Sequence, residues 1–186
     1  DAAVQMCIDA GIKSIEHGPF LTEKTLKRMA KEDVWLSPQA YLFGMTPEDL
    51  NIVGTPAELK MRQVNSDSDV VMKLAGKLGV KVAWGTDLFG PLDKQALQPL
   101  EFRARARYFS NVDILRQATS LNAELLKLSG LRHPYTEGAL GVIEEGAYAD
   151  IIIVDGNPLD DMELMVDPAT NFKLIMKDGV IYKNTL

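Results

Sequence analysis

The stretch "VKVAWGTDLFG", Val80–Gly90, is the part of the sequence that best defines the fold. Its largely apolar run, Val80–Trp84, has the composition of a strand buried on both faces, as strands of parallel sheets are. Gly85-Thr86 ends that run, and Asp87 follows where the chain leaves the sheet. A carboxylate is costly to bury unless it is paired, hydrogen-bonded or bound to metal. Asp87 is therefore solvated, tied to backbone N–H groups, or placed to do chemistry.

The segments before Val80 alternate between helical and strand patterns. In chain order they predict a helix ending before Gly11, a strand at 12–16, a helix within 21–33 with Thr22 as its N-cap, a strand at 34–37 and a helix at 57–78. This alternation is typical of βαβ units and a parallel sheet. Strand starts at residues 12, 34 and 80 fit the repeat of a (β/α)₈ barrel, although three strands cannot close one.

The composition changes after the helical patterns "NVDILRQATS" and "NAELLKLSG". From Thr136 onward the chain is rich in strand-forming residues and glycine turns, and Asp178-Gly179 is a strong two-residue hairpin signal. We predict a small antiparallel β unit at 136–186, following an α/β part at 1–135.

Charge and cysteine content limit the classes of partner. The net charge of −6 and the absence of a basic block argue against nucleic acid, and no apolar run is long enough to span a membrane. Cys7 is the single cysteine, which excludes an intrachain disulfide and a thiolate metal cluster. The chain begins at Asp1 as if inside a helix, so we expect it to be cut from a longer protein. Its compartment stays open, with the cytoplasm favoured.

Two polar residues follow predicted strands at the ends where parallel α/β folds gather functional groups. His17 follows the first strand and Asp87 the third. Imidazole and carboxylate together suit a divalent metal. The alternatives are a structural loop or core histidine and a turn or N-cap aspartate, and for His17 the structural alternative is favoured by spacing alone.

Other polar residues carry weaker signals. Gln39 and Tyr41 follow the second strand and are expected near the same rim, where they are candidates for contacting substrate. His133, before a proline, is expected to be solvated, and Cys7 to be a packing residue. For Arg103, Arg105 and Arg107, a solvated face or scattered ion pairs is the expectation.

An ordered set of motifs resembles one family. It consists of "IEHG", "GTD", "ATSLNAELLKLSG", "LGVIEEGAYADIIIVDGNPLDD" and "IMKDGVIYKN". Together these resemble the C-terminal half of an amidohydrolase-superfamily enzyme, nearest to the imidazolonepropionase-like branch that includes Xaa-Pro dipeptidases. The resemblance implies an α/β fold, a partial (β/α)₈ TIM barrel holding the last three strands, with part of a small C-terminal β-sandwich.

The resemblance also implies a chemistry. Members of this branch use two divalent metals, usually zinc, and a metal-activated hydroxide that attacks an amide of a dipeptide or related small molecule. His17 is similar to a ligand of the more buried metal, and Asp87 to the residue that binds the other metal and moves the proton. The family's His-x-His pair and bridging lysine have no counterpart here, and one His with one Asp falls short of three zinc ligands. We therefore expect this chain alone to bind metal weakly and to be inactive.

The sequence also predicts how the chain associates, and it leaves two alternative functions open. An incomplete barrel exposes strand edges, including that of Ile12–Glu16, so a homo-oligomer is expected. The first alternative is a non-catalytic half-barrel that binds or scaffolds. The second is part of a deaminase or cyclic-amide hydrolase with a single metal.

Overall fold

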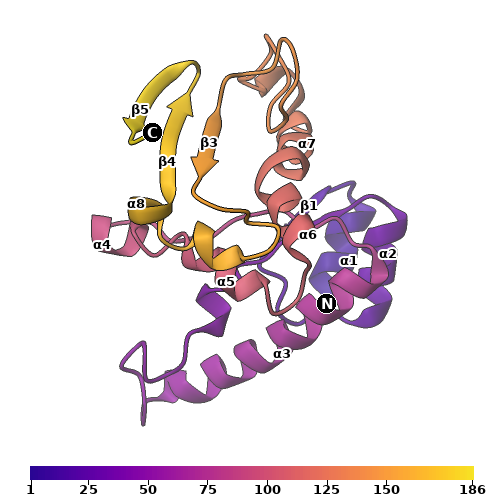
Figure 1. Cartoon of the computed structure of the whole chain (residues 1–186). Coiled ribbons are helices and arrows are strands. Elements are labelled where there is room, and N and C mark those ends of the chain that lie inside the picture. The colour runs from indigo at the N-terminus through magenta and orange to yellow at the C-terminus, as the bar shows by residue number, and fades with distance from the viewer.

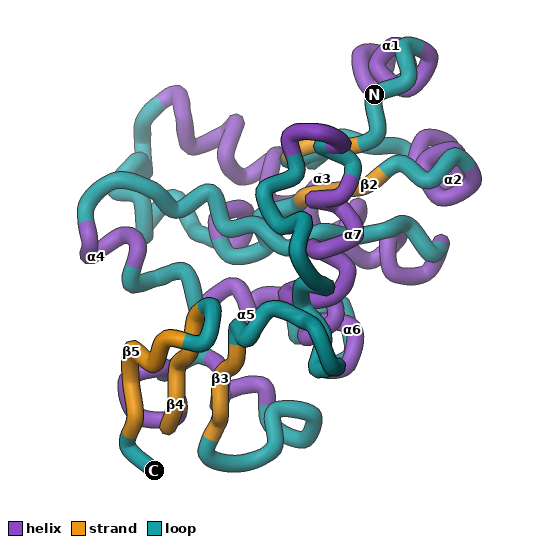
Figure 2. Tube along the Cα trace, turned by 90° about the horizontal axis from the view of Figure 1, so that it is seen from above, coloured by secondary structure: helices purple, strands orange, loops and turns teal.

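A computed structural model describes all 186 residues. It contains two separate sheets, which lie apart in both views of the backbone (Figures 1 and 2). The α-helices are α1 (Ala2–Asp9), α2 (Glu23–Lys31), α3 (Pro56–Leu78), α4 (Leu92–Gln95), α5 (Leu100–Arg105), α6 (Asn111–Arg116), α7 (Asn122–Lys127) and α8 (Pro168–Asn171). The strands are β1 (Ser14–Glu16), β2 (Trp35–Ser37), β3 (Ile151–Val154), β4 (Phe172–Lys177) and β5 (Val180–Asn184). Short 3₁₀ turns cover Leu42–Gly44, Gly130–Arg132 and Met162–Met165.

The first sheet is parallel, as the alternating pattern predicts. β1 and β2 pair in register, with Ile15 opposite Leu36. The predicted third strand is reduced to one bridge, in which Leu36 pairs in parallel with Val82. The three segments are the parallel core of a mixed α/β structure, and a closed TIM barrel is not formed within this chain.

The side chain of Asn122 binds the backbone at Trp84, at the end of the third parallel segment. Asn122, at the start of α7, accepts a hydrogen bond from the Trp84 N–H at 2.8 Å and donates one to the Trp84 carbonyl at 3.0 Å. This pair of bonds satisfies the backbone of Trp84 as a strand would. The strand pattern at 80–84 therefore ends with the side chain of a helix residue, and not another strand, bonded to Trp84.

The core of the parallel part lies between this sheet and its helices. Leu26 and Met29 of α2, Leu36 of β2 and Ala75 of α3 are completely buried in one apolar cluster. The Thr22 hydroxyl accepts a hydrogen bond from the Thr25 N–H, which confirms the predicted N-cap of α2. Cys7 packs against the same cluster, as expected for a packing residue.

The two helical patterns after residue 110 form one continuous helix interrupted by a π-helical turn. α6 leads into the π turn Gln117–Leu121 and then into α7. Gly141, with φ of +73°, lies against this turn, since a Cβ there would be 2.6 Å from the Thr119 carbonyl carbon. Only glycine allows both this close approach and this backbone conformation.

The second sheet is antiparallel, in the order β3-β4-β5. Asp178 and Gly179 join β4 to β5 with φ of 49° and 76°, which confirms the predicted hairpin turn. Residues 136–150 form turns and no strand, so the β unit is smaller than the composition predicts. Met162, Met165 and Phe172 pack on Ile114 of α6, which joins this unit to the helical part. The boundary at residue 136 stays a prediction.

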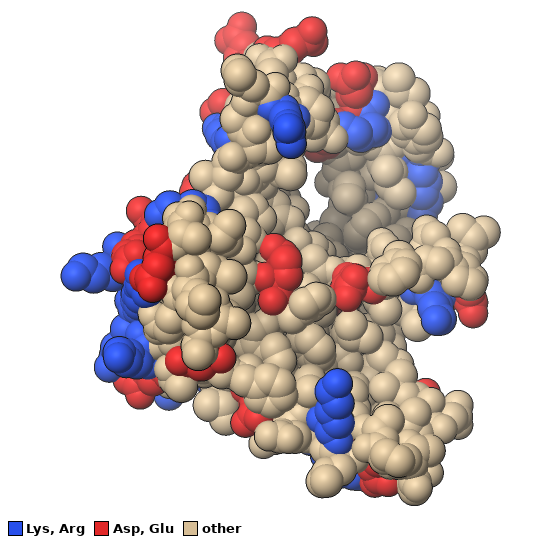
Figure 3. Space-filling view, turned by 180° about the vertical axis from the view of Figure 1, so that it is seen from behind, with Lys and Arg blue, Asp and Glu red and all other residues tan.

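The surface carries mixed charge. On the face seen in Figure 3, acidic and basic side chains intermingle along the left edge, beside broad uncharged areas. None of the helices combines the length and the apolar character that crossing a membrane requires.

Candidate active-site rim

His17 and Gln39 meet at the carboxyl ends of β1 and β2. His17 Nδ1 lies 2.7 Å from Gln39 Oε1, and Gln39 Nε2 donates to the Ser37 carbonyl at 2.8 Å. The Ser37 carbonyl also accepts the backbone N–H of His17 at 3.0 Å. His17 adopts φ of 68°, and its ring is otherwise exposed, with no protein partner at Nε2. The parallel register thus brings together two of the predicted site residues.

Asp87 lies at the end of the third parallel segment and is exposed. Its φ of 54° is in the left-handed region, and its carboxylate makes no hydrogen bond or ion pair within the chain. Gly85, two residues earlier, lies beside the network described above, since a Cβ there would be 3.9 Å from Gln39 Nε2. The strand exit that leads to Asp87 therefore belongs to the same rim.

Left-handed backbone at both candidate ligands has physical meaning. Strained conformations of this kind cost roughly 1–3 kcal/mol each and gather at functional sites. The other non-glycine residues with positive φ are the aspartate or asparagine residues Asp33, Asn51 and Asp178, types that tolerate this region in turns. Asp87 is of the same tolerant type, and histidine is also enriched in this region. The Ser37 carbonyl accepts the backbone N–H of His17 in this conformation.

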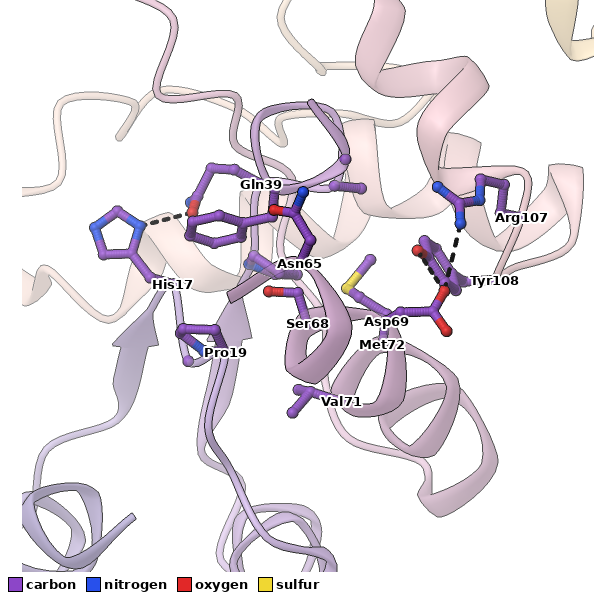
Figure 4. Close-up of a pocket in the computed structure, with 15 residues that line it drawn as sticks. His17, Pro19, Gln39, Asn65, Ser68, Asp69, Val71, Met72, Arg107 and Tyr108 are labelled. Carbon is purple, nitrogen blue, oxygen red and sulfur yellow. Dashed lines mark hydrogen bonds and ion pairs between the residues drawn. The ribbon is translucent and has the colours of Figure 1, made fainter. Parts of the chain in front are cut away.

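A cavity of about 120 Å³ lies between these strand ends and α3. Figure 4 shows His17 reaching Gln39 on one side and Asn65 and Ser68 of α3 on the other. The Oδ1 of Asn65 and the hydroxyl of Ser68 are buried without a hydrogen-bond partner. Two unsatisfied polar atoms beside a space of this size fit ordered water.

A hydrogen-bonded group closes the far wall of this cavity. Asp69 accepts a hydrogen bond from the Tyr108 hydroxyl at 3.0 Å and from Arg107 at 3.4 Å. Burial and the bond to Asp69 raise the pKa of Tyr108 to about 12. Asp69 also pairs with Lys73, and that hydrogen bond lowers the pKa of the Asp69 carboxyl.

Tyr41 is placed away from Gln39. It lines a different depression, together with Met45, Asp49 and Arg103, and does not line the cavity beside His17. Its backbone N–H donates to Glu101 Oε2 at 2.8 Å. The two residues predicted to contact substrate therefore do not share one pocket.

A buried ion pair beneath the loop after β2 was not anticipated from the sequence. Glu101 and Arg105 of α5 are completely buried and 2.6 Å apart. Glu101 also accepts the N–H of Ala40 at 2.9 Å, and Arg105 donates to Gln117 Oε1 at 2.7 Å and to the Pro38 carbonyl at 2.8 Å. The pair holds the loop that carries Gln39.

A solvated face or scattered ion pairs was expected for the arginine series, and Arg105 differs because its ion pair is completely buried. Arg103 and Arg107 form exposed ion pairs with Glu163 and Asp69, as expected. The signal for Arg105 was the acidic residue four positions before it, at Glu101, beside the apolar Phe102 and Ala104. Spacing alone did not reveal which side of the helix is buried.

Burial dominates the electrostatics of this pair. It raises the pKa of the Glu101 carboxyl, although Arg105 and two backbone N–H groups favour the ionised form. Because folding then favours the protonated carboxyl, stability contributed by this group is lost as the pH rises above the ordinary glutamate value.

His133 also differs from expectation. It is half-buried, its Nδ1 has no partner, and its ring lies edge-on to Tyr135 with 5.9 Å between centroids. The proline after it does not keep it in solvent, because the ring of Tyr135, two residues along the chain, lies beside it.

A metal ion needs more ligands than this chain brings together. His17 Nε2 and the Asp87 carboxylate are free and have the chemistry of metal ligands. However, no three His, Cys, Asp or Glu side chains gather closely enough in this chain to hold a metal ion. These two residues therefore fit as members of a ligand set that the chain does not complete.

The chain belongs to the amidohydrolase family, whose model matches residues 1–183. This match confirms the resemblance found in the motifs. The chain is therefore a member of a hydrolase family. Among curated proteins, ochratoxinase of Aspergillus niger is 25% identical over 183 residues, covering 98% of this chain and 36% of that protein.

Solved structures support the same branch. An amidohydrolase matches with a TM-score of 0.84 and 30% identity, over 100% of this chain and 43% of that one. A prolidase complexed with N-methylphosphonate-L-proline matches with a TM-score of 0.82 and 29% identity, over 98% of this chain and 43% of that one. A Xaa-Pro dipeptidase with bound methionine in its active site matches with a TM-score of 0.81 and 26% identity, over 98% of this chain and 43% of that one. This chain thus spans less than half the length of these relatives.

Proposed function

We propose that this chain carries part of the active site of a metal-dependent hydrolase that cleaves amide bonds in dipeptides or related small amides. The observation that carries the proposal is the placement of His17 and Asp87. Both follow segments of one parallel sheet, both have left-handed backbone, and both keep free ligand atoms. The similarity to a prolidase and to a Xaa-Pro dipeptidase supports dipeptides as the substrate class.

Each residue has a proposed role. His17 Nε2 and the Asp87 carboxylate would hold divalent metal, two ions of zinc in the complete enzyme. Zinc, when bound, makes water more acidic and polarises an amide carbonyl. Asp87 would accept a proton from the attacking water and return it to the departing amine nitrogen. Tyr41 would contact substrate from the loop after β2. Gln39, whose amide is engaged by His17 and Ser37, would act through His17.

The ligand count limits what this chain does alone. Catalytic zinc normally keeps three protein ligands and one open position. His17 and Asp87 are two candidates, and no group of three possible ligands forms within the chain. We therefore propose that the isolated chain binds zinc weakly and does not hydrolyse amides.

Zinc calorimetry on the chain tests this proposal, with Asp87→Asn as the variant. Asp93→Asn, an exposed aspartate in α4, is the matched control. We expect weak binding that Asp87→Asn weakens further and Asp93→Asn leaves unchanged. Tight binding together with hydrolysis of a dipeptide panel would overturn the inactivity. Zinc binding that is indifferent to Asp87→Asn would contradict the role of Asp87.

We also propose that the chain self-associates through its open strand edge. β1 pairs only with β2, so its outer edge has no partner in the sheet. Unpaired edges template pairing with other chains. Light scattering is expected to give a dimer or larger species, and a strictly monomeric chain would refute this.

A further inference from the structure

The orientation of the Gln39 amide is determined by its neighbours. One end of the amide lies 2.8 Å from the Ser37 carbonyl oxygen, which can only accept. That end must therefore be the NH₂ group. The other end, 2.7 Å from His17 Nδ1, is then the oxygen.

The position of the imidazole proton follows from this orientation. An amide oxygen only accepts, so His17 Nδ1 must donate to it. A neutral imidazole carries one N–H, and the hydrogen bond at one nitrogen determines the state of the other. His17 Nε2 is then the nitrogen with the lone pair.

The surroundings make this hydrogen bond selective. Gln39 is only 3% exposed, so bulk water does not compete for its amide. The Ser37 carbonyl uses its two acceptor positions on the Gln39 amide and on the His17 N–H, at 2.8 and 3.0 Å. Rotation of the amide would place its oxygen against that carbonyl oxygen, and a full desolvation penalty would result.

We propose that Gln39 is a positioning residue that fixes neutral His17 in its Nδ1–H form, so that the Nε2 lone pair points out from the rim. The use of this lone pair as a metal ligand rests on the proposed function. The tautomer itself does not, because it follows from hydrogen bonds within the chain.

Nitrogen-15 NMR of the histidine rings tests the inference on the metal-free chain. The chain has two histidines, and loss of a signal in His133→Gln assigns the other to His17. At mildly alkaline pH we expect protonated-type Nδ1 and unprotonated-type Nε2 for His17, opposite to free histidine in water. A His17 ring protonated at Nε2 would overturn the proposal without any variant.

A pair of glutamine variants isolates the cause. Gln39→Met keeps the side-chain length but removes the acceptor, and the two ring signals should move toward each other as the tautomers mix. Gln95→Met removes an exposed glutamine that donates to the Gly90 carbonyl, and should leave His17 unchanged. A His17 spectrum that is the same in Gln39→Met and wild type would refute the role of Gln39.

Addition of Zn²⁺ separates this inference from the proposed function. A shift confined to His17 Nε2 supports both. A shift confined to Nδ1 in the wild-type chain overturns the inference. A ring in the Nδ1–H form that ignores Zn²⁺ upholds the role of Gln39 and counts against metal binding at His17.

Discussion

Replacing Arg105 with methionine removes the centre of a buried polar network. The guanidinium of Arg105 is completely buried and donates to Glu101, Gln117 and the Pro38 carbonyl at 2.6, 2.7 and 2.8 Å. Methionine at this position keeps an apolar stem similar to that of arginine. It donates to none of the three acceptors that Arg105 binds. Glu101 keeps only the N–H groups of the loop after β2.

The expected magnitude follows from the burial of the pair. Removal of one member of a buried ion pair costs about 3–5 kcal/mol, because the remaining group stays buried without the partner that offset its desolvation. At about 1.4 kcal/mol per factor of ten, the folding equilibrium should shift by roughly 100- to 4,000-fold.

Urea unfolding followed by tryptophan fluorescence measures this loss. Trp84 is a local probe, since the Arg105 guanidinium lies 4.8 Å from its ring centroid. Arg103→Met is the matched control, in the same helix and also paired with a glutamate. Its pair with Glu163 is 57% and 53% exposed, so a loss of at most about 1 kcal/mol is expected.

A specific result would refute this reasoning. Equal losses for Arg105→Met and Arg103→Met would mean that burial of the pair at Glu101 has no energetic consequence. The double variant Glu101→Leu with Arg105→Met should be more stable than Arg105→Met alone, because it leaves no unpaired buried charge.

Three further changes test other parts of the structure. Asn122→Ala removes both hydrogen bonds to the Trp84 backbone and should destabilise the chain by about 1–3 kcal/mol in urea, whereas an unchanged midpoint would contradict the strand-substitute role. Gly141→Ala should cost clearly more than Gly146→Ala, because both glycines have positive φ, but only a Cβ at Gly141 meets backbone; equal costs would exclude the clash with the π turn. In an alkaline absorbance titration Tyr108 should ionise at about 12, later than ordinary tyrosine. Its folded-state pKa is raised, so the stability that it contributes is lost between about pH 10 and 12, and Tyr108→Phe should remove that loss.

The local elements could be predicted from the sequence because their signals are local. Helical spacing and Thr22 identified α2, Gly79 marked the end of α3, and Asp178-Gly179 identified the β4–β5 turn. Ordered motifs identified the family, because a set of short patterns in fixed order constrains the whole chain even when each pattern is weak.

The candidate site could be predicted only in part. His17 and Asp87 were predicted as candidates because the carboxyl ends of parallel strands lie at one edge of a sheet, and their role as ligands stays a prediction. The left-handed backbone at both, and the link from His17 through Gln39 to Ser37, depend on strand register and on a loop that spacing does not specify.

The buried pair of Glu101 and Arg105 shows most clearly what only the tertiary structure decided. In sequence, Arg105 belongs to a series of arginines at alternate positions, for which a solvated face or scattered ion pairs is the expectation. In the fold, the chain from Pro38 to Tyr41 covers α5 and supplies the carbonyl and N–H groups that these charges need. The sequence by itself determined the first helices and strands, the β4–β5 turn and the family. Burial of the pair required contacts between residues about 60 positions apart, and those form only when the chain packs.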